Sequence, residues 1–183
     1  MEIKTLFGLP AHPLLVHVPI VLVPLAAIGA VLMLWPRFRA KIGWATVVIA
    51  GIATVFTFLA VGSGEQLEEA VERTANERLL EAHTEIGENL RPWILLLFVV
   101  LLAIMLFDVY RARAAAGGES KLSPSAAKSI GIALSVLSIV FAGLSTYWVV
   151  EIGHSGAKAS WEKTGKQMER SGGESGESGD ADD

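Results

Sequence analysis

Residues 92–107 read PWILLLFVVLLAIMLF, and this stretch contains no charged residue and no glycine. Three other stretches also lack a formal charge: residues 5–36, 42–64 and 129–150. An α-helix rises about 1.5 Å per residue, so about 20 apolar residues cross the ~30 Å hydrocarbon core of a bilayer. The three other stretches reach this length, and residues 92–107 reach it when extended to residue 110, with Asp108 at the interface. The pattern predicts four membrane-spanning helices.

The composition excludes an ordinary soluble globular protein. Hydrophobic residues make up 52% of the 183 residues and charged residues 19%, and the mean hydropathy is +0.49. Soluble domains have about 45–50% apolar and roughly 25% charged residues. The absence of cysteine excludes disulfides, thiolate metal sites, iron–sulfur clusters and thiol nucleophiles. No phosphate-binding loop, Ser/His/Asp order or nucleic-acid-binding patch stands out in the sequence.

We therefore expect an all-α fold, an integral membrane four-helix bundle formed by residues 1–160. The four spans are expected at about residues 13–35, 42–62, 92–110 and 128–150. A cleavable signal peptide is the main alternative for the first span. The transmembrane interpretation is favoured because the run is too long for a signal-peptide core and contains Pro13, Pro19 and Pro24.

The segment between the second and third spans has the pattern of an amphipathic helix. Ser63 and Gln66 have the spacing of a capping box, and apolar residues then recur at helical spacing as far as Ile86. We expect an extramembrane helix over about residues 64–87, lying across the end of the bundle. Residues 161–183 are rich in glycine, serine and acidic residues and are expected to form a disordered acidic tail.

The loop charges predict the orientation. Residues 37–41 and 108–128 together hold seven basic and two acidic residues, whereas the rest of the chain holds eight basic and seventeen acidic ones. Basic loops stay in the cytoplasm. We expect a multi-pass protein of the bacterial inner (cell) membrane, with the N-terminus, the C-terminus and the loop after the second span outside.

The four histidines all fall on the outer side in this orientation. His12 precedes the first span and His17 lies in its first turns, where Pro19 cannot donate a hydrogen bond and should make the helix irregular. His83 lies on the apolar face of the amphipathic helix. His154 follows the fourth span among small residues, Gly153-His154-Ser155-Gly156, that allow close approach of a large planar group or of backbone.

Neutral imidazole is a good ligand for haem iron, copper and zinc. Two imidazoles from different helices can hold one haem, and helical bundles often build such sites between facing side chains. Interfacial hydrogen bonding by the four imidazoles, and another metal or a proton site, remain alternatives. No His-Glu-x-x-His motif indicates a zinc hydrolase, and no methionine lies near a histidine in the sequence to favour copper(I).

Three motifs carry a family resemblance. The run His12-Pro13 to His17-x-Pro19-Ile20, the segment with His83 and Gly87, and Gly153-His154-Ser155-Gly156 together resemble bacterial four-helix membrane proteins grouped as domain-of-unknown-function family 2231. The resemblance covers about residues 8–157 and implies a membrane bundle of unestablished function. Members resemble small b-type cytochromes in their histidine-bearing bundles, and this analogy favours haem.

The leading functional hypothesis is a haem-b-binding electron-transfer protein with bis-histidine ligation near the outer membrane face. The preferred ligands are His17, His83 and His154, with His12 as the fourth candidate. The protein is expected to lie in the lipid bilayer and to exchange electrons with quinol or a periplasmic redox protein. No nucleic-acid partner is expected. The alternative is a non-catalytic membrane subunit or metal-binding module of a larger complex. Either function is favoured over an enzyme. A transporter would need a polar path through the bilayer, and the sequence does not indicate one.

Overall fold

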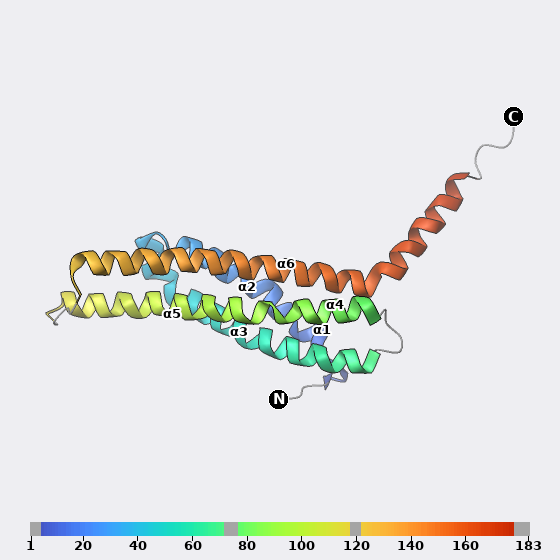
Figure 1. Ribbon diagram of the computed structural model, residues 1–183, viewed down its shortest axis with the longest axis horizontal. Coiled ribbons are helices and arrows are strands. Elements are labelled where there is room, and N and C mark those ends of the chain that lie inside the picture. The colour runs from blue at the N-terminus through green and yellow to red at the C-terminus, as the bar shows by residue number, and fades with distance from the viewer. Residues whose placement is uncertain (1–4, 72–76, 118–121, 178–183) are drawn as a thin grey trace.

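The computed structural model describes residues 5–71, 77–117 and 122–177, which are helical over most of their length (Figure 1). A two-stranded hairpin comes first, and helices follow it. The elements are β1 (Thr5–Leu6), β2 (Leu9–Pro10), α1 (Ala11–Leu15), α2 (His17–Leu32), α3 (Pro36–Val71), α4 (Glu77–Glu88), α5 (Leu90–Ala115) and α6 (Pro124–Glu177).

Among the residues that the structure describes, four helical segments are long and apolar enough to cross a membrane. These spans are Ala11–Leu32, Pro36–Leu67, His83–Ala115 and Pro124–Lys158. Helix α2 packs against α3 and α6, and α5 packs against the same two helices, so the four form a closed bundle. The predicted all-α four-helix membrane bundle is confirmed. The connections from α2 to α3 and from α5 to α6 lie at one end of the bundle, called the basic end below (Figure 1).

Small residues bring α2 and α3 together. Ala26 and Ala30 of α2 and Ala50 and Ala53 of α3 are buried in the core. At Gly29 an added Cβ would lie only 2.5 Å from Thr46 Cγ2 on α3, so this crossing requires glycine. Close approach of backbones is typical of helix pairs in lipid, where association depends on packing rather than on release of water.

Buried hydroxyl groups in the bundle bond mainly to their own helix. Thr54 Oγ1 donates to the Ala50 carbonyl and Thr57 Oγ1 to the Ala53 carbonyl, each at 2.8 Å. Such bonds satisfy a polar group inside an apolar environment without a partner on another helix. Thr54 Oγ1 also lies 3.4 Å from the Ile94 carbonyl oxygen of α5.

The break predicted near His17 is present. Helix α1 ends at Leu15 and α2 begins at His17, with Val16 between them. Pro19 has no N–H to donate to the carbonyl of Leu15, which explains why the two helices do not run on as one.

The separate extramembrane helix is not supported, and the capping-box interpretation of Ser63 is wrong. Helix α3 continues through Ser63 to Val71, and Ser63 Oγ donates to the Ala60 carbonyl at 2.8 Å instead of capping a helix N-terminus. Glutamate, glutamine, leucine and alanine follow, and these residues favour continued helix. The amphipathic segment is thus divided between the end of α3 and α4, which meets α5 at Asn89. Residues 72–76 lie outside the described residues.

Residues 161–177 also differ from the predicted disordered tail. They are helical and form the last part of α6, which runs away from the bundle (Figure 1). Residues 157–170 contain alanine, lysine, glutamate, glutamine and methionine, which are strong helix formers and let α6 continue past its apolar part. Residues 178–183 lie outside the described residues.

Candidate histidine site

The N-terminal hairpin and α1 place His12 beside α3. The hairpin turns at Phe7 and Gly8, whose φ angles of 54° and 79° are those of a tight two-residue turn. Ala11 and Leu15 of α1 are then buried against Ala60 of α3. His12, between them in sequence, is half-buried, and its Nδ1 lies 2.8 Å from the Ala60 carbonyl oxygen.

His83 belongs to α4, and its imidazole contacts α6. Its Nδ1 lies 2.9 Å from Ser155 Oγ, and the Ser155 hydroxyl donates its hydrogen to the Ile152 carbonyl at 2.9 Å. Since that hydroxyl has one hydrogen, it accepts from His83 Nδ1–H. The Ala60 carbonyl can only accept, so His12 also donates from Nδ1. In the neutral form, both rings therefore carry their lone pair on Nε2.

The two imidazoles lie next to each other. The ring centroids of His12 and His83 are 6.2 Å apart, with the ring planes at 81°. This contact joins residues from α1 and α4 that are 71 positions apart in the sequence. We call the end of the bundle that holds His12 and His83 the histidine end.

Two glycines give the rings room. A Cβ added to Gly64 would lie 3.0 Å from His12 Cε1, and one added to Gly156 would lie 2.9 Å from His83 Cε1. Both distances are shorter than the separation of about 3.5–4.0 Å that carbon atoms in contact prefer. The small-residue motif around His154 predicted close approach of a planar group, and the group that approaches Gly156 is the His83 imidazole. The role of Gly64 was not predicted from the sequence.

His17 and His154 lie outside the pair. Both are exposed, and His17 Nδ1 bonds to the Pro13 carbonyl. His154 precedes Ser155, so all four histidines lie toward the histidine end, but only His12 and His83 meet. Within residues 5–71, 77–117 and 122–177, no group of three or more His, Cys, Asp or Glu side chains could hold a metal ion.

An arginine with two carboxylate partners lies at the same end. Arg91 Nη2 is 3.2 Å from Glu65 Oε1, and Arg91 Nη1 is 3.8 Å from Glu88 Oε1. The guanidinium also lies over the Phe58 ring, 5.9 Å from its centroid. These contacts connect the first turn of α5 to α3. They lie beside the histidine pair, because Glu65 directly follows Gly64, which lies against the His12 ring.

The four spans and the paired imidazoles at one end define the class of protein, an integral membrane four-helix bundle. Within that class, the chain belongs to the family described as predicted membrane protein (DUF2231), whose sequence model matches residues 8–167. No curated protein and no solved structure matches the chain. The family description places the chain in a membrane and names no activity.

Proposed function

We propose that this protein binds haem b through His12 and His83 and transfers electrons at the histidine end of the bundle. The observation that carries the proposal is the contact between these two imidazoles, whose ring centroids are 6.2 Å apart. Each ring is oriented by a hydrogen bond from its Nδ1, to the Ala60 carbonyl for His12 and to Ser155 Oγ for His83. Haem accepts and returns one electron when it is bound. The protein's part is to hold two nitrogen ligands and to keep their tautomers fixed.

The number of ligands favours haem over a bare metal ion. A structural zinc site takes four protein ligands and a catalytic one takes three, and two imidazoles supply neither number. A haem would need only two nitrogen ligands from the protein, and His12 and His83 would supply them.

The hydrogen bonds of the pair also suit ligation. A ligating histidine usually donates its other ring N–H to a carbonyl, a carboxylate or a similar acceptor, which orients the ring and fixes the tautomer. The Ala60 carbonyl serves His12 in this way and Ser155 Oγ serves His83. Gly64 and Gly156 supply the space that lets both rings adopt these positions. Quinol in the bilayer or a periplasmic redox protein is the proposed electron partner.

The proposed location is the inner membrane of a bacterial cell, with both termini and the histidine end outside. The support is the distribution of charge: the connections at the basic end hold seven basic and two acidic residues, whereas the rest of the chain holds eight basic and seventeen acidic ones.

An absorption spectrum of the detergent-purified protein tests the proposal. After expression with added haem, the wild-type chain should show a Soret band and reduced α and β bands of a six-coordinate haem. His12→Ala and His83→Ala should lose these bands. His17→Ala and His154→Ala are matched controls, because both histidines are exposed and lie outside the pair, and these variants should keep them. A wild-type protein without a Soret band, or four variants with the same spectrum, would overturn the haem assignment.

A second function has its own supporting observation. The bonds of His12 and His83 already join α1 to α3 and α4 to α6 without any ligand. The same pair would suit a non-catalytic membrane subunit or metal-binding module, in which it fixes the end of the bundle that meets a partner. In that case, replacing both histidines lowers the stability of haem-free protein and abolishes partner assembly, while the wild-type chain takes up no haem.

A further inference from the structure

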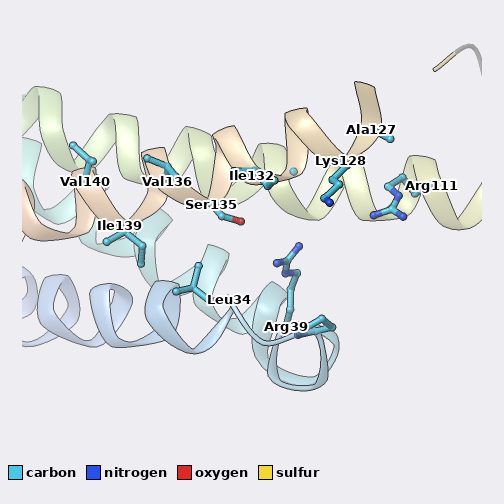
Figure 2. A pocket seen from close by; sticks show the side chains of 12 residues that line it. Leu34, Arg39, Arg111, Ala127, Lys128, Ile132, Ser135, Val136, Ile139 and Val140 are labelled. Carbon is cyan, nitrogen blue, oxygen red and sulfur yellow. The ribbon is translucent and has the colours of Figure 1, made fainter. Parts of the chain in front are cut away.

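A cavity of about 620 Å³ opens at the basic end, far along the bundle from the histidine pair (Figure 2). It lies between α6 and the turn that joins α2 to α3. Leu34 and Arg39 line it from the side of that turn, Arg111 lines it from α5, and the first four turns of α6 form the opposite wall. The cavity therefore belongs to a region that the histidine site does not use.

Three basic side chains gather at the mouth of this cavity. Figure 2 shows Arg39 and Lys128 extending toward the space between them, with Arg111 beside Lys128. Arg39 Nε donates to the Met33 carbonyl at 2.8 Å, and its Nη1 lies 3.7 Å from Asp108 Oδ1. Of these three cations, only Arg39 has a carboxylate neighbour among the described residues, Asp108, so the mouth carries a net positive charge that attracts an anion.

The rest of the cavity is an apolar strip on α6. Ile132, Val136, Ile139 and Val140 line it, and Ile132, Val136 and Val140 are 55%, 57% and 47% exposed. These residues belong to the apolar span Pro124–Lys158, so their exposed surface faces lipid. From the cation Lys128 to the far end of the strip at Val140 is about 18 Å at 1.5 Å per residue, close to one leaflet of a ~30 Å hydrocarbon core.

Gly131 leaves the volume that a ligand would fill. It lines the cavity between the cations and the apolar strip, and a Cβ added there would meet no atom within 4 Å. Ser135, one turn further, is also small. A larger side chain at residue 131 would therefore extend into the cavity.

We propose that this cavity is a binding site for one anionic phospholipid. The phosphate lies among Arg39, Arg111 and Lys128, and one acyl chain follows the strip on α6. Basic pockets between membrane helices bind anionic headgroups in this way, with charge-assisted hydrogen bonds from arginine to phosphate. The apolar strip favours a lipid over a free anion, because a soluble phosphate would leave it uncovered. The net positive charge favours an anionic headgroup over a zwitterionic one.

Native mass spectrometry of the delipidated full-length protein in detergent tests this proposal. The probes are phosphatidylglycerol, phosphatidylcholine of the same chains, and inorganic phosphate. Phosphatidylglycerol should bind at one site, at least tenfold more tightly than phosphatidylcholine, and millimolar inorganic phosphate should not displace it. Equal binding of the two lipids, or full displacement by inorganic phosphate, would overturn the assignment to an anionic lipid.

Two pairs of variants test the location. Arg111→Gln with Lys128→Gln should weaken phosphatidylglycerol about 30-fold, since each basic residue near an anionic lipid contributes roughly fivefold. Lys41→Gln with Arg113→Gln removes two basic residues that do not line the cavity and should have little effect. Gly131→Leu should block binding, whereas Gly143→Leu, which is equally open but does not line the cavity, should not. Equal binding by a variant and its control would refute the proposed position.

Discussion

Replacing Gly156 with alanine should destabilise the histidine end, whereas replacing Gly153 should not. Both glycines lie in α6, one helical turn apart. The added Cβ at residue 156 would lie 2.9 Å from His83 Cε1 and 3.4 Å from both ring nitrogens, whereas the one at residue 153 would meet nothing within 4 Å. Gly153→Ala is therefore a control that shares every effect of the substitution except the contact.

The size of the effect follows from these distances. Carbon atoms in contact prefer about 3.5–4.0 Å, so the imidazole must move by roughly 0.5–1 Å. A shift of that size stretches the 2.9 Å bond between His83 Nδ1 and Ser155 Oγ toward the limit of a hydrogen bond. Overpacking of this kind costs about 1–3 kcal/mol. Both variants gain up to about 1 kcal/mol of helix propensity, which cancels when they are compared.

The assay is reversible unfolding in mixed micelles, with SDS as denaturant and far-ultraviolet circular dichroism as the signal. We expect the unfolding free energy of Gly156→Ala to lie about 1–3 kcal/mol below that of Gly153→Ala. Equal free energies for the two variants would show that the His83 ring does not lie over residue 156, and the account of the pair would fail.

Three further predictions concern packing, charge and orientation. Gly29→Ala should cost about 1–3 kcal/mol in the same unfolding assay, and adding Thr46→Ala should recover most of it, since the Thr46 side chain is the obstacle; a double variant no better than the single one would contradict this. Asp108→Asn should change the unfolding free energy by less than about 1 kcal/mol, because its ion pair with Arg39 is long and partly exposed, and a larger loss would show a buried role. Alkaline phosphatase fused after the C-terminal residue should be active in bacteria and inactive when fused after Gly117, and the reverse pattern would overturn the proposed orientation.

The four spans could be predicted because a bilayer imposes one dominant requirement, a charge-free run of sufficient length. Residues 42–64 meet it by composition alone, without any knowledge of their neighbours. Ser63 shows where local patterns fail. The same serine can cap a helix or bond to a carbonyl three residues earlier, and the helix-forming residues from Glu65 onward favour the second state. Which state forms depends on whether the preceding helix ends, and the capping motif does not determine that.

The histidine pair could be predicted only in part. Hydropathy and loop charge placed four imidazoles toward one end, but they carry no information on which two would meet. That choice depends on the packing of α1 against α3 and of α4 against α6. From the sequence His12 is only the fourth ligand candidate, yet its position beside Ala60 makes it the neighbour of His83. Ser155 and Gly156 lay within a motif already singled out, and Gly64 gave no signal in the sequence.

Helix α6 extends well beyond its apolar part, so its C-terminal end lies away from the apolar bundle. Its apolar part ends near Val150, and residues 151–177 continue the helix beyond it. At about 1.5 Å per residue this continuation is roughly 40 Å long, comparable to the ~40–45 Å thickness of a whole bilayer with its headgroups. A protein that recognised the charged end of α6 would dock about one bilayer thickness away from the apolar bundle. Such a partner could bind there and leave the histidine end accessible to a second molecule.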